Sequence, residues 1–187
     1  MTKIKTSASD PLKIDEVIVP GTGGRIGMTL LPGRSDDQSI YGNHWRRDLA
    51  ADLDALRRLD PALVITLNES HEFARLGVPG FEQALAESGL PWRHIPIPDG
   101  GVPDRTFERA WAKAGREARD ALRAGKLVVI HCRAGLGRTG TIAARLLAEL
   151  GTPQLAAIEA VRTARGPHAV ETRDQERYVL ATQQVEE

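Results

Sequence analysis

Short runs of apolar residues predict five β-strands. Two of these runs lie within Glu16–Leu31 and flank the turn-forming Gly21–Gly24, so they predict a hairpin. Ala62–Leu67 is a compact run rich in branched residues and predicts a buried strand, as does Trp92–Ile97. Leu127–Ile130, four apolar residues with no polar residue between them, is the clearest strand in the chain.

Apolar residues three or four positions apart predict helices between and after these strands. The longest is Asp104–Ala124, which Gly125 is expected to end. Asn43 is expected to cap a helix that continues to about Leu59. The other expected helices are a short one from Ser70, one around Phe81 and Leu85, 139–150, one from Gly151 to about Arg165, and one from Arg173 to about Gln183.

Strand and helix alternate through the middle of the chain. This order predicts an α/β fold with a central, mostly parallel sheet flanked by helices, and the helix-rich C-terminal half is expected to cover one face. The 187 residues suffice for one substantial domain. Residues 14–187 are therefore predicted to form this single domain, and the polar residues 1–13 a flexible N-terminal tail.

The composition excludes several classes of protein. Lys plus Arg and Asp plus Glu both number 25, so the zero net charge provides no general attraction to nucleic acid. The single cysteine excludes a disulfide framework within the chain. Because no apolar run could span a membrane and the start lacks a signal-peptide core, a cytoplasmic location is expected. No metal or other cofactor is expected, since four histidines lack metal-ligand spacing: His44, His71, His94 and His168.

The segment His131–Thr139 follows the clearest strand and opens a helix. Backbone N–H groups at a helix N-terminus bind phosphate oxygens, and glycines in the loop keep side chains out of that space. Arg138 adds a planar fork of N–H donors. The same surroundings favour the thiolate of Cys132, which is the form that attacks phosphorus. The segment therefore predicts a cysteine-dependent phosphatase whose phosphate-binding loop is Arg133, Ala134, Gly135, Leu136, Gly137 and Arg138.

Other residues have expected roles around this loop. His131 would orient the loop through hydrogen bonds, and Thr139 would offer its hydroxyl to the departing sulfur. The leaving group needs a general acid, for which Asp99 and Asp104 are the candidates. Asp99 is favoured because it leaves a strand end before two glycines, whereas Asp104 can simply cap the following helix.

Release of phosphate from the cysteine requires a positioned water molecule. Gln175 is the candidate for holding this water. The spacing Thr172-x-x-Gln175 also fits a helix capping box, and one glutamine can serve both purposes. Both interpretations therefore stand at this point.

The segment His131–Thr139 resembles the signature of the protein tyrosine phosphatase superfamily, which is His-Cys, five residues, Arg, then Ser or Thr. Pro96–Asp104 is similar to the acid loop of the kinase-associated phosphatases, a dual-specificity branch that acts on cyclin-dependent kinases. Gly27–Gly33 and Ala169–Gln175 also resemble segments of that group. The resemblance extends over about residues 16–183, nearly the whole chain.

This resemblance implies a sheet of mainly parallel strands flanked by helices, with Cys132 as the nucleophile, Arg138 as the phosphate ligand and Asp99 as the general acid. The expected reaction is hydrolysis of phosphate monoesters in proteins through a phospho-cysteine intermediate. Phosphotyrosine is the first expected substrate, and phosphoserine or phosphothreonine the second. The expected partner is accordingly a phosphorylated protein or peptide.

Three alternatives compete with this interpretation. A phosphoinositide or inositol-phosphate phosphatase often carries several basic loop residues, whereas this loop has the basic Arg133 but the apolar Leu136. A sulfurtransferase would need neither the acid loop nor the hydroxyl after the arginine, and this chain has both. A silent phosphate-binding module would not need the intact Cys132 and Asp99. A phosphoprotein phosphatase is therefore favoured.

Overall fold

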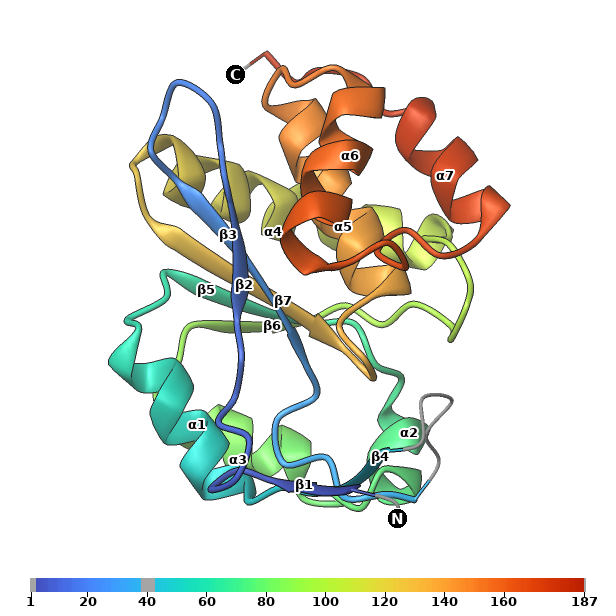
Figure 1. Cartoon of the computed structure of the whole chain (residues 1–187). Helices are drawn as coiled ribbons and strands as arrows, with labels where there is room; N and C mark the ends of the chain where they lie inside the picture. Colours follow the sequence, from blue (N-terminus) through green and yellow to red (C-terminus); the bar gives the residue numbers. More distant parts are fainter. Residues whose placement is uncertain (1–2, 38–42, 187) are drawn as a thin grey trace.

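The computed structural model describes residues 3–37 and 43–186, in which a five-stranded sheet separates two groups of helices (Figure 1). The strands of this sheet are β2 (Asp15–Ile18), β3 (Arg25–Leu30), β5 (Leu63–Thr66), β6 (Trp92–His94) and β7 (Leu127–Cys132). Their order across the sheet is β2–β3–β7–β5–β6. β2 and β3 form the expected antiparallel hairpin, and all other neighbours are parallel. The predicted α/β class with a mostly parallel central sheet is confirmed.

The central strand β7 is buried on both faces, which explains its unbroken apolar run. Successive side chains of a strand point to opposite faces. Val128 and Ile130 therefore pack in one hydrophobic core, and Leu127 and Val129 pack in the other. Each core is completed by helices on its own side of the sheet.

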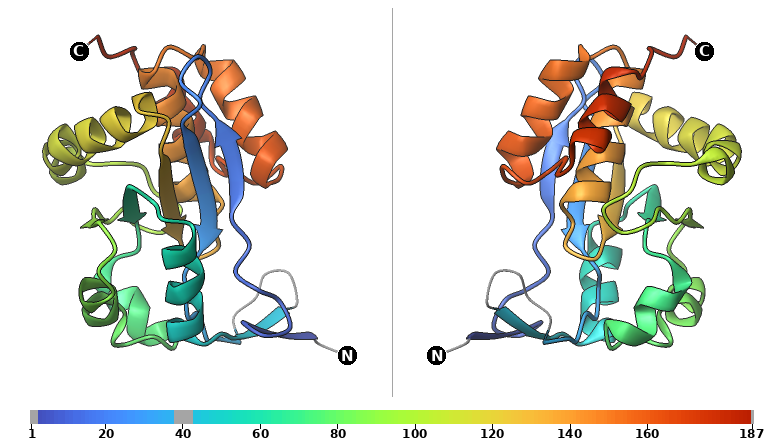
Figure 2. Two further views of the ribbon diagram at one scale, coloured as in Figure 1. Left: turned by 90° about the vertical axis from the view of Figure 1, so that its left-hand side faces the viewer. Right: turned by 90° about the vertical axis from the view of Figure 1, so that its right-hand side faces the viewer.

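The helices of the N-terminal and C-terminal halves of the chain lie on opposite faces of the sheet. α4–α7 pack against the core that contains Val128, and α1–α3 against the core that contains Val129 (Figures 1 and 2). The C-terminal half therefore covers one face, as predicted. The helices are α1 (Leu49–Arg58), α2 (Ser70–Arg75), α3 (Phe81–Glu87), α4 (Arg105–Arg123), α5 (Gly137–Glu149), α6 (Gln154–Arg165) and α7 (Arg173–Leu180).

The prediction that Asn43 caps the first helix is wrong. Asn43–Arg46 form a strand, β4, which pairs in parallel with β1 (Lys3–Thr6). The helix begins only after Asp48, whose carboxylate accepts a hydrogen bond from the amide of Ala51 at 2.8 Å. Asp48 is the better cap because it lies directly before the apolar periodicity, while the pairing of β4 with β1 depends on distant residues.

Three other boundaries differ from the sequence predictions. The strand expected over Trp92–Ile97 ends at His94 and is half-buried, because β6 is the edge of the sheet. The last helix ends at Leu180, before the expected Gln183. Within the segment 1–13, taken as a tail, Lys3–Thr6 form β1 against β4. None of the helices in the described parts of the chain is both long and apolar enough to cross a membrane.

Candidate active site

The segment predicted to bind phosphate lies at the carboxyl end of β7, in the middle of the sheet. β7 ends at Cys132, which is 3% exposed, and α5 begins at Gly137. The intervening loop turns sharply at Gly135, which has a φ of 68°. A Cβ atom at Gly135 would lie only 2.2 Å from the carbonyl oxygen of Thr29, so glycine is required there.

The carbonyl groups of this loop are held by an arginine of α6. Arg165 donates from Nε to the carbonyl oxygen of Gly135 at 2.9 Å and from Nη2 to that of Ala134 at 3.0 Å. Its third nitrogen, Nη1, binds Asp15 of β2 at 2.6 Å. Within the described residues, the amides of residues 134–137 donate to no backbone or side-chain acceptor. Arg165 therefore directs the loop carbonyls outward and leaves those amides available for an anion at the N-terminus of α5.

Arg138 is held from behind by Glu72 of α2. Nη1 and Nη2 of Arg138 donate to the two carboxylate oxygens of Glu72 at 2.6 and 2.9 Å, and Nη1 also donates to the carbonyl oxygen of Ile97 at 2.9 Å. The side chains of Arg138 and Glu72 are 1% and 0% exposed. Such a bidentate pair fixes the plane of the guanidinium group. Glu72 therefore holds Arg138 in a fixed orientation at the start of α5.

Arg138 and Glu72 both stay charged although they are buried, because each charge stabilises the other. Burial disfavours the charged form of Glu72, but its hydrogen bonds with Arg138 and the positive charge there outweigh this and lower its pKa. Burial likewise disfavours the charge of Arg138, yet hydrogen bonds to Glu72 and the negative charge of that carboxylate raise its pKa above the ordinary value. Both groups therefore remain ionised at neutral pH.

The two candidate acids have different surroundings. Asp99 lies 2.9 Å from Nη2 of Arg138 and 3.6 Å from Nη1 of Arg133, and its side chain is 46% exposed. Asp104 instead accepts hydrogen bonds from the amides of Thr106 and Phe107, at 2.9 and 2.8 Å, as the N-cap of α4. The structure therefore places Asp99 against the phosphate-binding loop and leaves Asp104 engaged in capping a helix.

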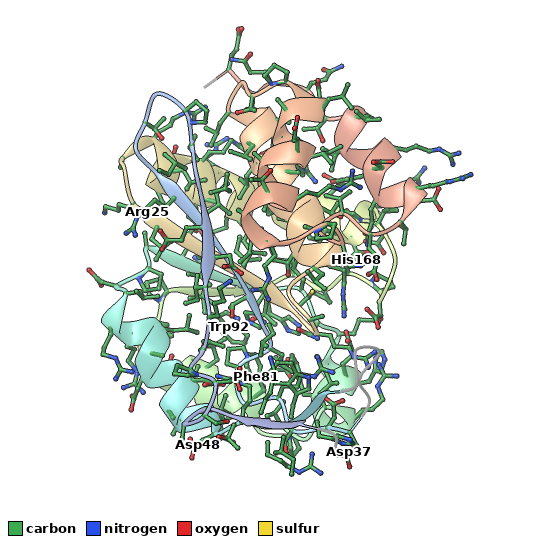
Figure 3. All side chains as sticks on the ribbon, viewed as in Figure 1. Arg25, Asp37, Asp48, Phe81, Trp92 and His168 are labelled. Atoms are coloured by element: carbon green, nitrogen blue, oxygen red, sulfur yellow. The ribbon has the colours of Figure 1, made fainter. Side chains whose placement is uncertain are left out.

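His131 is fully buried on the α1–α3 side of the sheet, where Phe81 and Trp92 also lie (Figure 3). Its Nε2 lies 2.8 Å from the hydroxyl of Thr66, which accepts a hydrogen bond from the indole N–H of Trp92. Burial, with the charges of His94 and Arg138, lowers the pKa of His131 to about 3. Within the described residues Nδ1 of His131 has no hydrogen-bond partner, so the side-chain hydrogen bond of His131 is made to β5.

Gln175 lies where the phosphate-binding loop and the acid loop meet. It is fully buried, and its Nε2 donates to the carbonyl oxygen of Gly101 in the acid loop at 3.0 Å. Its Oε1 accepts from the amides of Glu171 and Thr172, and the Thr172 hydroxyl accepts from the Gln175 amide in return. A Cβ atom on Gly137 would lie 3.1 Å from Oε1 of Gln175. The capping box is therefore present, and the same side chain borders the loop.

Thr139 is the last residue of the predicted segment His131–Thr139, and the histidines other than His131 are expected to lie outside the site. In the part of the chain that the structure describes, the buried hydroxyl of Thr139 has no hydrogen-bond partner. Outside the site, His94 contacts the carbonyl oxygen of Asn68 and lies 3.1 Å from Glu82. Residues 3–37 and 43–186 contain no group of three His, Cys, Asp or Glu side chains arranged as metal ligands.

Sequence reasoning missed Glu72 and Arg165. Glu72 lies 66 positions from Arg138, inside a short helical stretch whose pattern distinguishes no charged residue. Arg165 lies 30 positions from Gly135 in the last turn of α6, where an arginine is expected merely as a favourable partner of the helix dipole. No local signal marks either residue, because their contacts arise only when α2 and α6 pack beside the loop.

Comparisons with known proteins agree with this geometry. A family model described as polymorphic toxin system, DSP-PTPase phosphatase, matches residues 42–152, which is more than half of the chain. Cyclin-dependent kinase inhibitor 3 of Rattus norvegicus is 32% identical over 157 residues, covering 82% of this chain and 69% of the relative. The protein of the same name from Homo sapiens is 29% identical with the same coverage.

Solved structures show the same fold. Kinase associated phosphatase, crystallised with its catalytic-site cysteine replaced by serine, has a TM-score of 0.77 and 25% identity, covering 90% of this chain and 92% of that one. Tk-PTP in the active form has a TM-score of 0.64 and 26% identity, covering 88% and 93%. The chain therefore belongs to the dual-specificity family of protein tyrosine phosphatases and is a hydrolase of that class.

Proposed function

We propose that this enzyme hydrolyses phosphate monoesters of proteins through a phospho-cysteine intermediate on Cys132. The observation that carries the proposal is the contact of Asp99 with Arg138 at 2.9 Å, directly beside the loop that follows Cys132. This contact brings the candidate acid, from the segment Pro96–Asp104, to the loop that carries both the nucleophile and the anion ligand. A cysteine that must remain a thiolate also favours a reducing compartment such as the cytoplasm.

In the first step, the loop amides and Arg138 bind the non-bridging oxygens of the phosphate. The thiolate of Cys132 attacks phosphorus, so that a sulfur–phosphorus bond forms while the ester oxygen–phosphorus bond breaks. Asp99 donates its proton to the departing oxygen, which leaves as an alcohol or phenol. Glu72 contributes by holding the guanidinium plane of Arg138, since a preoriented donor need not reorganise in the transition state.

In the second step, water attacks the phospho-cysteine. Asp99, now a carboxylate, takes a proton from the water while the sulfur–phosphorus bond breaks and inorganic phosphate forms. Gln175 uses one amide proton for the carbonyl oxygen of Gly101, and its second is available to position the water. The Thr139 hydroxyl, buried without a partner in the described residues, would donate to the departing sulfur of Cys132.

Phosphoproteins are the proposed substrate class. The apolar Leu136 occupies a loop position at which a basic residue would serve a multiply phosphorylated substrate, and the Arg133 side chain is 3.6 Å from Asp99. The relatives named cyclin-dependent kinase inhibitor 3 are consistent with a protein substrate. The loop residues and the relatives together favour a single phosphate on a polypeptide over an inositol ring that carries several phosphates.

A substrate panel tests this proposal. Wild type and the Asp99→Ala variant are assayed with phosphotyrosine, phosphoserine and phosphothreonine peptides and with mono- and bisphosphorylated phosphoinositides in detergent micelles. We expect kcat/KM for the best phosphopeptide to exceed that for every lipid by at least about tenfold, which corresponds to about 1.4 kcal/mol. A lipid as the best substrate would contradict the assignment to phosphoproteins, and no turnover of any phosphoester would contradict the mechanism.

The contacts of Arg165 lead to a second prediction. Arg165→Met removes the donors to the carbonyl oxygens of Ala134 and Gly135 and leaves Asp15 without this partner. Each lost hydrogen bond to a charged group is worth about 1.5–3 kcal/mol, so we expect inorganic phosphate to bind at least about tenfold more weakly. Calorimetric titration with phosphate measures this. Arg177→Met, at an exposed arginine of α7, is the matched control and should bind phosphate like wild type. Equal loss in both variants would contradict the role of Arg165.

A further inference from the structure

The backbone that enters α7 is strained beside the phosphate-binding loop. Val170 has a φ of 60° and its side chain is 1% exposed. A β-branched residue in the left-handed region is a true conformational outlier. Such strain persists only where the surrounding structure holds it, and it is concentrated at functional sites. Glu171 follows this strained residue directly.

Two features hold this segment in place. Arg162 of α6 donates from Nε to the carbonyl oxygen of Ala169 at 3.1 Å and from Nη2 to that of Val170 at 2.9 Å. On the other side, Gly140 of α5 lets the segment approach closely, because a Cβ atom there would lie 2.7 Å from the nitrogen of Val170. The backbone before Glu171 is thus fixed between α5 and α6.

The held backbone directs Glu171 to the phosphate-binding loop. The amide of Glu171 donates to Oε1 of Gln175 at 2.9 Å. A Cβ atom on Gly137 would lie 2.9 Å from Oε2 of Glu171, so the carboxylate lies against the last glycine of the loop. Glu171 is nevertheless exposed to solvent. The negative charge of Glu171 therefore lies at the rim of the site. The part of a substrate next to the phosphate would lie close to this charge.

A carboxylate at this position repels the phosphate itself, and nothing in the chemistry proposed above requires it. A positively charged group of the substrate would offset this repulsion. Additional phosphates on a substrate would instead meet the carboxylate of Glu171. The rim of the site is therefore suited to a substrate that carries a cation beside a single phosphate.

We propose that Glu171 determines substrate specificity by selecting phosphorylated residues that have a lysine or arginine next to them in the polypeptide. The inference rests on the proposed function, because it assumes that a phosphopeptide occupies the site. Exposed ion pairs change affinity by up to about fivefold, and repulsion between like charges by a similar factor. Exchanging a neighbouring Glu for Lys in the substrate is therefore expected to raise kcat/KM by about tenfold, and by less at high ionic strength.

The test uses two phosphotyrosine peptides that differ only in Lys or Glu at the positions flanking the phosphorylated residue. Wild type should prefer the Lys peptide by about tenfold. E171Q should reduce this ratio to about threefold or less, and E171K should bring it to one or reverse it. E159Q removes an exposed carboxylate of α6, changes the net charge equally, and should keep the wild-type ratio.

Failure of the inference and failure of the proposed function have different signatures. A ratio near one in an active wild-type enzyme overturns the specificity role of Glu171. So does a ratio that stays unchanged in E171Q while kcat falls equally for both peptides, because Glu171 would then act on the reaction. A wild-type enzyme that hydrolyses bisphosphorylated lipid in micelles better than either peptide would instead contradict the proposed phosphoprotein function and the inference with it.

Discussion

Replacing Cys132 with serine is expected to reduce hydrolysis of p-nitrophenyl phosphate by at least about 10⁴-fold, a loss typical of removing a catalytic nucleophile. A serine hydroxyl is almost wholly protonated at neutral pH and cannot attack phosphorus as a thiolate does. Binding of inorganic phosphate should be retained, because the loop amides and Arg138 supply the donors and serine is nearly the same size. Steady-state kinetics and calorimetric titration measure the two properties separately.

Arg138→Lys is the complementary variant for this experiment. Lysine keeps a positive charge but cannot bind both Glu72 oxygens and a phosphate in one plane, as the guanidinium group can. We expect Arg138→Lys to lose most phosphate binding while Cys132 remains open to alkylation by iodoacetamide. Turnover by Cys132→Ser within tenfold of wild type would contradict the role of Cys132 as nucleophile.

Replacing Asp99 with alanine is expected to lower kcat by about 10²–10³-fold for substrates with poor leaving groups, which is the usual contribution of a general acid. The loss should be much smaller for p-nitrophenyl phosphate, since p-nitrophenolate departs without a proton. Phosphate binding should not weaken, because the variant frees the Arg138 nitrogen that Asp99 contacts at 2.9 Å. The measurement is kcat for a series of aryl and alkyl phosphates of increasing leaving-group basicity.

Asp104→Ala is the matched control in the same loop. The carboxylate of Asp104 accepts hydrogen bonds from the amides of Thr106 and Phe107. Removing this helix cap should lower the free energy of unfolding by about 1 kcal/mol. We expect a lower melting temperature but the wild-type dependence on the leaving group. A steeper dependence in Asp104→Ala than in Asp99→Ala would make Asp104 the acid.

The pairing of Arg138 with Glu72 illustrates why the site is built on rigid elements. Arg138 lies in the first turn of α5 and Glu72 in α2, on the opposite side of the sheet. The guanidinium group therefore reaches past the carboxyl ends of the strands to bind a helix of the other layer. Breaking such a buried pair costs about 3–5 kcal/mol, because one charge is left uncompensated. Both layers of the fold thus contribute to the orientation of the Arg138 side chain.

Local patterns were sufficient to predict most of the fold. The alternation of strands and helices and the apolar run of β7 depend on residues that are close in sequence, and the structure confirms them. The capping role of Asp104 likewise follows from its own neighbours. Asn43 shows the limit of this approach, since the choice between capping a helix and joining β4 depends on Lys3–Thr6, some 40 residues earlier.

The nine residues from His131 to Thr139 are sufficient by themselves to predict the position of the phosphate-binding loop. A loop that binds an anion at a helix N-terminus is made from consecutive residues, so its pattern is visible in the sequence. Only the tertiary structure shows which of the two aspartates lies against that loop, and it alone brings Glu72, Arg165 and Glu171 to it. These side chains come from distant segments, and their contacts depend on how the helices pack around the carboxyl ends of the strands. Periodicity and spacing within the sequence do not predict contacts between such distant segments.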